Sequence, residues 1–600
     1  MRNPEYVLKS LKNKSEDTNY KYDRLYRNLY NVNFFLKAYG NIYAKEGNMT
    51  EGIDSKTIDG MSIKRIEKLI EKLKDEKYVP NPVKRTYIPK KNGKKRPLGI
   101  PSIDDKLVQE VVRMILNEIY ENSFSTNSHG FRENRSCHTA LKQIKGHYDG
   151  ARWFVEGDIE SFFDNIDHHK LIEILKEKIK DEKFIRLIWK FLRAGYLEQW
   201  VYHKTYSGTP QGGILSPLLA NIYLDKLDKF IEKYTEKFNK GIKRKLNNDY
   251  VNITNKINRR RKKLASASND DINRLKAEIS ELRKKRNEIP SIIVNDETYK
   301  RMFYTRYADD FLIGVIGSKQ DAVNIKNDLR NFLAEELKLN LSDEKTLITN
   351  TEKPARFLGY DIRVSRSQDI KKCDDGIVKR THSYTCKLYV PNDIWVKKLK
   401  DLKILKITKD GTWKQNHRAN LINMDDLEIL NIYNSQIRGL YNYYRLANNV
   451  SVLNKFYYHM KYSMYKTYAN KYKSTINKIT NRFCKNGVFQ IEYETKYGFK
   501  SRKFYNDGFK INPKVNVTKD LDNLPNEQKN RGETSLIDRL KARKCEWCES
   551  ENKDIEIHHV RKLKDLKGKK EWEKEMIGRK RKTLALCHEC HWKLHNGKLD

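Results

Sequence analysis

The spacing of apolar residues changes along the chain and predicts alternating helical and mixed segments. Residues 20–75 carry apolar side chains at helical spacing, and a helix is predicted from Asp105 to Tyr120 after a basic, hairpin-like segment. Residues 150–230 and 300–365 alternate short apolar runs with helical stretches, which indicates an α+β domain. Helical spacing returns over residues 390–485.

A charged insert separates the two α+β segments. Its apolar residues recur at helical spacing in two runs, with a turn at Ser266–Asp270 between them. The runs contain Leu246, Tyr250, Ile253, Ile257 and Leu264, and then Ile272, Leu275, Ile279 and Leu282. The pattern predicts a helical hairpin within residues 240–290.

Two adjacent carboxylates interrupt an otherwise apolar, strand-like run. Asp309 and Asp310 follow Met302–Tyr307 and precede Phe311–Val315. A carboxylate pair is unfavourable in apolar surroundings unless a cation binds it. The arrangement predicts a β-hairpin with both Asp at its turn, placed to hold divalent metal ions. An ordinary Asp-Asp turn is the alternative.

A second apolar strand carries a carboxylate that would complete such a site. Asp158 stands near the end of the run Trp153–Ile159. Two-metal phosphoryl transfer needs carboxylates from separate strands, which hold one ion at the attacking hydroxyl and one at the leaving phosphate. Two further segments suit a nucleotide: a basic turn at Lys90–Pro101 and a Gly-rich approach to a helix at Ser207–Pro217.

The composition favours nucleic acid as the partner. A chain of 600 residues is too long for one hydrophobic core, so several domains are expected. The formal net charge of +42, from 121 Lys and Arg against 79 Asp and Glu, is hard to accommodate without a polyanion. The 36 Tyr can stack on unpaired bases, which favours RNA or single-stranded DNA. A basic but inert surface is the alternative, and the helical insert is either a solvated spacer or a grip on RNA.

Cysteine usage and the N-terminus indicate an intracellular protein without a membrane span. No apolar run approaches membrane-spanning length, and Met1–Val7 lacks the apolar core of a signal peptide. Near the C-terminus stand two CxxC pairs, Cys545 with Cys548 and Cys587 with Cys590. Four thiolates in this spacing are typical of a closed, structural Zn²⁺ site in a reducing compartment.

In this order, the motifs resemble a reverse transcriptase, and specifically the proteins encoded by bacterial group II introns. The resemblance extends over nearly the whole chain and includes His129–Arg132, the Asp158 strand, the Tyr307–Asp310 box and Phe357–Tyr360. It implies an α+β multidomain protein with the fingers and palm of a right-hand polymerase, an α-helical thumb or maturase domain, and a small ββα-metal HNH module.

The resemblance assigns the polymerase carboxylates. Asp158, Asp309 and Asp310 are the expected catalytic residues, and they would hold two Mg²⁺. Asp158 and Asp309 would carry most of the metal, and the carbonyl of Ile159 would add a ligand.

The resemblance also assigns the nucleotide contacts. Lys94 and Arg96 would contact the triphosphate, and Gln211 would touch the incoming dNTP. Phe163 matches the family's steric gate, an aromatic ring that leaves no room for a ribose 2′-hydroxyl. A simple core position for Phe163 is the alternative.

The helical region after the palm resembles a maturase domain, which serves as the polymerase thumb and helps the intron RNA to fold for splicing. The matching segments are Asn431–Ser435, Arg438–Gly439 and Asn442–Tyr444. Two apolar stripes run through this region and are expected to be core, with direct base stacking as the alternative. They contain Leu430, Tyr433, Ile437, Leu440 and Tyr444, and then Tyr458, Tyr462, Tyr465 and Tyr472.

The C-terminal Cys/His module resembles an HNH endonuclease. By this match His559 is the general base, since imidazole titrates near neutral pH. His558 and His591 would bind one Mg²⁺, with His595 available to assist. Lys582 replaces the Asn that usually orients the base, and a DNA-binding zinc module without cleavage is the alternative.

The predicted domains follow from these assignments. They are an N-terminal helical extension (1–75), fingers and palm (76–375), thumb and maturase domain (376–485), a DNA-binding region (486–535) and the HNH module (536–600). The expected protein binds its intron RNA, target DNA and dNTPs, is compatible with a homodimer, and works in the bacterial cytoplasm at the nucleoid. Two alternatives are a reverse transcriptase of another bacterial class and a splicing cofactor without enzyme activity.

Overall fold

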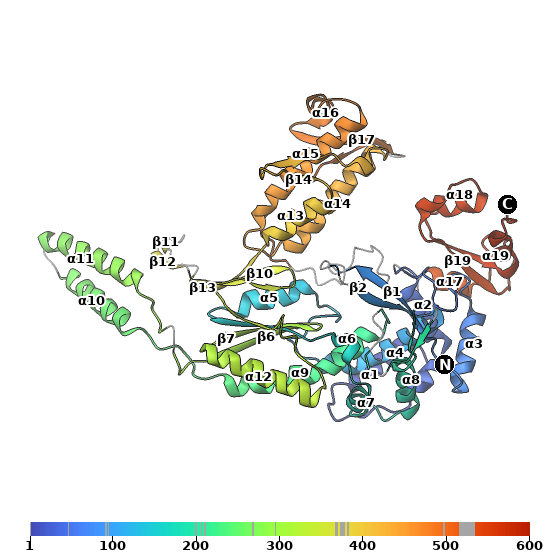
Figure 1. The fold of residues 1–600 in the computed structure, drawn as a ribbon, viewed down its shortest axis with the longest axis horizontal. Helices are drawn as coiled ribbons and strands as arrows, with labels where there is room; N and C mark the ends of the chain where they lie inside the picture. Colours follow the sequence, from blue (N-terminus) through green and yellow to red (C-terminus); the bar gives the residue numbers. More distant parts are fainter. Residues whose placement is uncertain are drawn as a thin grey trace.

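A central block of strands and helices carries three outlying parts of the chain (Figure 1). The computed structural model describes residues 2–45, 47–89, 93, 95–198, 201–205, 207–208, 212–266, 269–293, 296–366, 370–372, 378–380, 383–495, 498–514 and 535–600. A helical hairpin projects from one end of the block, thumb helices rise from its middle, and the C-terminal module lies beside the N-terminal helices. Within the described ranges, no helix has the length and apolar character needed to cross a membrane.

The N-terminal extension and the fingers form the first part of the block. The extension contains α1 (Pro4–Lys14), a 3₁₀ turn (Tyr26–Tyr30), α2 (Val32–Ile42) and α3 (Ile63–Lys74). The finger strands are β1 (Val83–Pro89), β2 (Lys95–Ile100), β4 (Tyr196–Glu198) and β5 (Val201–His203), in the order β2-β1-β4-β5. The predicted basic hairpin and the helix after it are therefore confirmed.

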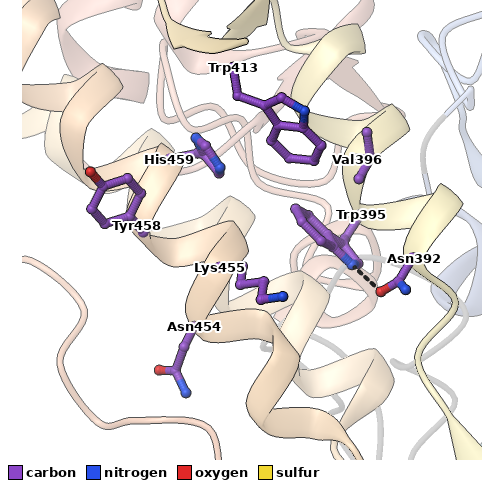
Figure 2. Close-up of a pocket in the computed structure, with 8 residues that line it drawn as sticks. All are labelled: Asn392, Trp395, Val396, Trp413, Asn454, Lys455, Tyr458 and His459. Carbon is purple, nitrogen blue, oxygen red and sulfur yellow. Dashed lines mark hydrogen bonds between the residues drawn. The ribbon is translucent and has the colours of Figure 1, made fainter. Parts of the chain in front are cut away.

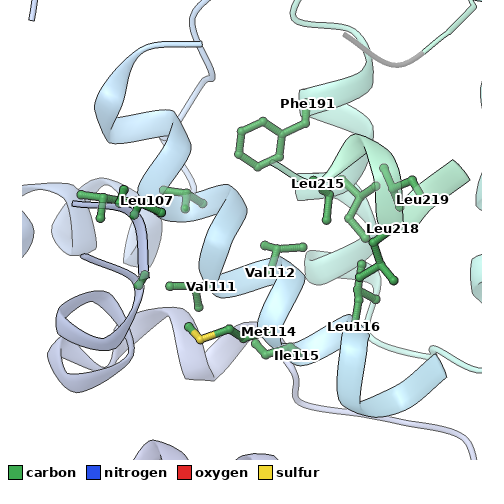
Figure 3. Packing of buried hydrophobic residues seen from close by; sticks show 14 of the residues in the cluster. Leu107, Val111, Val112, Met114, Ile115, Leu116, Phe191, Leu215, Leu218 and Leu219 are labelled. Carbon is green, nitrogen blue, oxygen red and sulfur yellow. The ribbon is translucent and has the colours of Figure 1, made fainter. Parts of the chain in front are cut away.

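Helix α4 (Ile103–Tyr120) is the core element of this part. Figure 3 shows its apolar residues, such as Leu107 and Val111, among side chains from α8 (Glu182–Leu192) and α9 (Ser216–Phe238). Leu107, Val111 and Val112 are fully buried. This packing holds the fingers against the palm through the hydrophobic effect.

The palm is a four-stranded antiparallel sheet in the order β6-β7-β3-β8. Its strands are β3 (Trp153–Asp158), β6 (Arg301–Tyr307), β7 (Asp310–Ile316) and β8 (Leu347–Asn350), and the helices around it are α5 (Cys137–His147), α6 (Phe162–Asn165), α7 (His168–Lys176), α9 and α12 (Lys319–Glu336). Successive side chains of a strand point to opposite faces. Val155 accordingly joins a core shared with the fingers, and Phe154 a core shared with the thumb.

The charged insert forms the predicted helical hairpin. Its arms are α10 (Asn248–Leu264) and α11 (Asn269–Glu288), and Arg260 Nε donates to Glu278 Oε2 at 2.5 Å between them. In Figure 1 the pair extends well away from the palm.

Small sheets follow the palm sheet and lead into the thumb helices. The strands are β9 (Ala355–Phe357), β10 (Tyr360–Arg366), β11 (Ile370–Lys372), β12 (Val378–Arg380), β13 (Ser383–Tyr389), β14 (Leu405–Ile407) and β15 (Trp413–Gln415). The helices are α13 (Asn392–Asp401), α14 (Asp426–Tyr444), α15 (Leu453–Lys471) and α16 (Ile476–Phe483). The hydroxyls of Tyr443 and Tyr444 donate to the carbonyls of Leu358 and Gly359, at 2.8 and 2.9 Å, and so tie α14 to the turn between β9 and β10.

Residues after 485, which the sequence analysis assigned to DNA binding without predicting strands, form a sheet. Strands β16 (Cys484–Lys485), β17 (Val488–Thr495) and β18 (Gly498–Lys503) pair in that order. Asn434 on α14 donates to the carbonyl of Lys503 at 2.9 Å and accepts from the backbone N–H of Tyr505 at 2.8 Å. The alternation Phe489, Ile491 and Tyr493 is the signal that could have predicted β17.

The C-terminal module contains the two strands and the final helix of the predicted ββα unit, with one further helix before the strands and another between them. It contains α17 (Ser535–Lys541), β19 (Ile555–His559), α18 (Glu571–Gly578), β20 (Thr583–Cys587) and α19 (His588–His595). Leu536, Ile537 and Leu540 on α17 are buried in the same hydrophobic core as the N-terminal helices. The first and last parts of the chain therefore share one packed interface.

Candidate active sites

The three palm carboxylates meet at one end of the sheet. Asp158, at the end of β3, pairs with Asp310, at the start of β7, and Tyr307 pairs with Asp310 across the predicted hairpin. Asp309 lies in the turn. A Cβ added at Gly157 would overlap the ring of Phe311, so the absence of a side chain there lets β3 and β7 align.

The electrostatics of this group favour a bound cation. Burial and the charges of Asp309 and Asp158 raise the pKa of Asp310 to about 7. Burial also raises the pKa of Asp309, an effect that the positive charges of Arg96 and Lys345 oppose. Lys345, which the sequence analysis missed, donates to Asp158 Oδ2 at 2.8 Å. Its positive charge offsets part of the negative charge of the three carboxylates. Carboxylate oxygens are hard ligands that suit Mg²⁺.

The donor atoms of the palm group are less convergent than those of the C-terminal module. Within the described ranges, two groups of three or more His, Cys, Asp or Glu residues have donor atoms that all lie within 4.8 Å of one another, and both groups lie outside the palm. Like charges repel each other, so three carboxylates are expected to spread until a cation is bound.

A buried Arg, which sequence reasoning also missed, supports the turn that carries Asp309. Arg306 is fully buried and donates to Asp228 through Nε at 2.8 Å and Nη2 at 2.6 Å. Its Nη1 donates to the carbonyl of Ala308 at 2.9 Å. Ala308 has a positive φ of 58°, and Gly130 of the His129–Arg132 motif packs so closely on it that a Cβ would clash. The motif is thus a scaffold for the turn.

On the nucleotide side of the site, glycines let backbone segments pack closely against each other. Gly208 lies against the backbone carbonyls of Phe163 and Asp164, and Gly212 lies against the carbonyl of Gly99 on β2, with no room for a Cβ at either position. Ser207 Oγ donates to the carbonyl of Asp164 at 2.9 Å. The two ends of this loop are therefore fixed to α6 and to the strand that carries Arg96.

The structure places some of the predicted nucleotide and metal contacts, and others lie outside the described residues. Arg96 is exposed on β2, and its charge acts on Asp309. Phe163 is half-buried, with its ring centroid 5.3 Å from that of Phe162. Ile159 is 1% exposed and forms a β-bridge with Leu341. Lys94 and Gln211 lie outside the described residues.

The four cysteines of the C-terminal module converge. Cys545, Cys548, Cys587 and Cys590 form one of the two clusters with donor atoms within 4.8 Å. The Sγ atoms of Cys548 and Cys587 are 3.8 Å apart, close to the S–S edge of about 3.8 Å expected for tetrahedral zinc with Zn–S bonds of about 2.3 Å. Hydrogen bonds from Ser550 lower the pKa of Cys548 to about 6, which favours the ligating thiolate. The set fits a structural Zn²⁺.

The histidines of the module form the second cluster. His558, His591 and His595 converge, and the cluster includes Asp59 from the N-terminal extension, which the sequence analysis did not predict. Glu556 Oε2 lies 2.6 Å from His591 Nδ1, an outer carboxylate of the kind that orients metal-binding imidazoles. Burial alone would lower the pKa of His591, but hydrogen bonds with Asp59 and Glu556 raise it to about 9.

His559 is held next to this cluster but faces a tyrosine. Burial lowers its pKa to about 3, so the imidazole is neutral in this arrangement. Its Nε2 lies 2.6 Å from the hydroxyl of Tyr39 on α2. Lys582, which stands where the family has an orienting Asn, is exposed, and its backbone carbonyl accepts a hydrogen bond from the N–H of Val560 at 3.0 Å.

The thumb carries an aromatic recess of about 690 Å³ (Figure 2). Its lining consists of Asn392, Trp395, Val396, Trp413, Asn454, Lys455, Tyr458 and His459. The rings of Trp395 and Trp413 are 5.9 Å apart, and those of Trp413 and His459 5.4 Å. Tyr458 is 50% exposed whereas Tyr465 is buried, so the predicted tyrosine stripe is only partly core.

Comparisons with known proteins identify each part of the chain. Family models match residues 88–254 as reverse transcriptase (RNA-dependent DNA polymerase), 383–548 as type II intron maturase, and 545–591 as AI2M/AI1M-like HNH endonuclease. The group II intron-encoded protein LtrA of Lactococcus lactis subsp. cremoris is 47% identical over 97% of both chains. The chain belongs to the group II intron-encoded proteins.

More distant relatives match different lengths of the chain. A 91 kDa protein of unknown character in the cob intron of Schizosaccharomyces pombe is 36% identical over 96% of this chain and 70% of its own length. Protein YkfC of Escherichia coli is 33% identical over 59% of this chain and 86% of its own. The intron-encoded protein thus combines reverse transcriptase, maturase and HNH endonuclease domains, and a reverse transcriptase of another class is excluded.

Proposed function

We propose that Asp158, Asp309 and Asp310 are the catalytic carboxylates of RNA-directed DNA synthesis. The observation that carries this proposal is the pairing of Asp158 with Asp310 across β3 and β7, with Asp309 in the adjoining turn. Two Mg²⁺ bound there would activate the primer 3′-hydroxyl and neutralise the triphosphate. Lys345 would release Asp158 when the ions bind. Arg96 and Lys94 would face the triphosphate. Gln211 and Phe163 would face the nucleotide.

One variant tests the polymerase and maturase roles separately. Asp309→Ala should abolish cDNA synthesis on a primed RNA template, because the turn would lose its metal ligand. Binding to the intron RNA should stay close to the wild-type value, since the charge change is small against +42. Asp328→Ala, at an exposed palm carboxylate, is the control and should polymerise normally. Polymerisation by Asp309→Ala would refute the metal assignment.

The maturase proposal is that the thumb and the basic surface stabilise the folded intron RNA without supplying splicing chemistry. The Asp309→Ala variant should therefore still accelerate splicing at low Mg²⁺. Splicing no faster than that of the RNA alone would count against this role. The aromatic recess between α13 and α15 supports it, because flat rings beside Lys455 suit an unstacked base.

The nuclease module would cut target DNA to provide the primer. His559 would take a proton from water, and His558 and His591, assisted by His595, would hold one divalent ion, Mg²⁺ in this proposal, at the leaving oxygen. The intron RNA would insert into one DNA strand, and the cut in the other would start reverse transcription. His559→Ala should lose nicking of target DNA and keep primer extension. Persistent nicking would assign the base elsewhere.

The described part of the predicted DNA-binding region packs on α14 of the thumb, and we keep the DNA contact as a proposal for the region as a whole. The partners in this scheme are the intron RNA, target DNA and dNTPs.

A further inference from the structure

A carboxylate from outside the nuclease module completes its histidine cluster. Asp59 lies between α2 and α3, about 500 residues before the histidines. Its Oδ2 is 2.8 Å from His595 Nε2 and 3.4 Å from His591 Nε2, and its Oδ1 is 3.3 Å from His558 Nδ1. His595 Nε2 and His591 Nε2 are 3.1 Å apart.

Three of these separations match the edges of a metal-ligand tetrahedron. Bonds of about 2.0–2.1 Å from a tetrahedral ion to nitrogen or oxygen place the donor atoms about 3.3 Å apart. The separations among Asp59 Oδ2, His591 Nε2 and His595 Nε2 are 2.8, 3.1 and 3.4 Å, and one donor atom from each of the four residues lies within 4.8 Å of the others. The four side chains therefore surround a volume of the size that one ion fills.

Ring nitrogens of the histidines are available to bind an ion in the same volume. His558 is 5% exposed, and within the described residues neither of its ring nitrogens makes a hydrogen bond. A buried imidazole without a hydrogen bond is unfavourable unless another group uses its lone pair. His591, whose other ring nitrogen faces Glu556, is oriented with Nε2 toward the cluster.

Backbone pairing positions Asp59. Met61 forms an antiparallel bridge with Ile557 on β19, so that Gly60 N–H donates to the carbonyl of Ile557 and Ile557 N–H donates to the carbonyl of Met61, both at 3.1 Å. Gly60 has a φ of +70°, and its missing side chain faces His591, 3.6 Å from where a Cβ would stand. The N–H of His559 donates to Asp59 Oδ1 at 2.6 Å. The N-terminal extension thus pairs with the edge of the nuclease sheet and places the carboxylate of Asp59 next to the histidines.

We propose that Asp59 is the fourth protein ligand of a divalent first-row transition ion held with His558, His591 and His595, and that this ligation closes the nuclease site. Three imidazoles favour an ion of the Zn²⁺ type over Mg²⁺. Four protein ligands in a tetrahedron leave no position for water or phosphate, which is typical of structural rather than catalytic sites. Tyr39, from the same extension, covers Nε2 of His559. Cleavage then requires that the extension withdraws Asp59 and Tyr39.

Cobalt binding to the full-length protein tests the ligand assignment without relying on cleavage. The cysteine site is first filled with Zn²⁺, and Co²⁺ is then titrated while its visible absorption is followed. Wild type should bind one equivalent with the strong absorption of a tetrahedral ion. Asp59→Ala should bind Co²⁺ about tenfold or more weakly, with a changed spectrum. Asp59→His, which restores a ligand, should recover affinity, and Asp54→Ala, in the same loop, should match wild type. Zinc retained by the cysteines shows that each variant's module is folded.

Two results would overturn the assignment. If wild type binds no Co²⁺ beyond the cysteine site, the cluster is held by a protonated His591 between Asp59 and Glu556 instead. If Asp59→Ala binds Co²⁺ with unchanged affinity and spectrum, the histidines form the site alone.

Nicking of target DNA at saturating metal tests the closure, and this arm alone rests on the proposed nuclease function. Asp59→Ala and Tyr39→Phe should both nick faster than wild type. Equal rates in all three would refute closure. Absence of nicking in every variant, with the cobalt results as expected, would refute the nuclease function while supporting Asp59 as a ligand.

Discussion

Asp228→Asn is the most direct test of how the catalytic turn is supported. The substitution keeps the shape of the side chain and removes its charge. Asp228 accepts two hydrogen bonds from Arg306, at 2.8 and 2.6 Å, and one from the Tyr304 hydroxyl at 2.7 Å. Both members of the ion pair are fully buried. The guanidinium would therefore remain in the core without a counter-charge.

The expected magnitude follows from this burial. Removing one partner of a buried ion pair costs about 3–5 kcal/mol, because the other charge stays desolvated. In a domain of the palm's size, each kcal/mol lowers the melting temperature by about 2–4 °C, so a decrease of roughly 6–20 °C is expected. Arg306 also donates to Ala308 in the turn, so primer extension should fall even below the melting temperature.

Asp328→Asn is the matched control, because the Tyr234 hydroxyl donates to Asp328 Oδ2 at 2.8 Å on the exposed surface. A surface change of this kind should alter stability by less than about 0.5 kcal/mol. The assay measures the temperature at which half of the primer-extension activity is lost after brief heating, beside a thermal melt of each protein. Equal shifts for the two variants would refute the argument that the buried pair supports the palm.

Three further substitutions test the nucleotide site, the palm sheet and the thumb. Phe163→Val should raise ribonucleotide incorporation in single-nucleotide extension, because a smaller side chain admits the 2′-hydroxyl; unchanged discrimination would leave Phe163 as a core residue. Gly157→Ala should destabilise the palm by about 1–3 kcal/mol and reduce primer extension, because its Cβ would overlap Phe311, and Phe311→Leu in the same chain should restore part of the activity. Full activity of Gly157→Ala alone would argue against a tight β3–β7 contact. Trp413→Ala should weaken intron RNA binding by about 1–3 kcal/mol through lost base stacking, measured by filter binding. Trp592→Ala, an exposed tryptophan of the nuclease module, serves as its control, and equal affinities would show that the recess does not hold a base.

Local patterns explain which elements were predictable. The strands around Asp309 and Asp310, the helix up to Tyr120 and the helical insert all follow from apolar spacing over a few residues, whereas the ββα module was predicted from the resemblance to HNH endonucleases. Strand β17 was missed because its alternating apolar residues stand among charged ones in a polar segment. The tyrosines of α15 were predicted as one stripe, but Tyr465 packs against Phe489 of β17 and is buried, whereas Tyr458 is not.

The sequence by itself determined the family, the candidate carboxylates, the two CxxC pairs and the histidines, because these are short motifs whose chemistry depends on residue type and local spacing. Only the tertiary structure decided which distant groups meet. It paired Asp158 with Asp310, placed Asp228 beside Arg306, and brought Asp59 to the histidines. Such contacts join segments far apart in the chain, and they form because sheet pairing and core packing bring whole elements together, which no local pattern records.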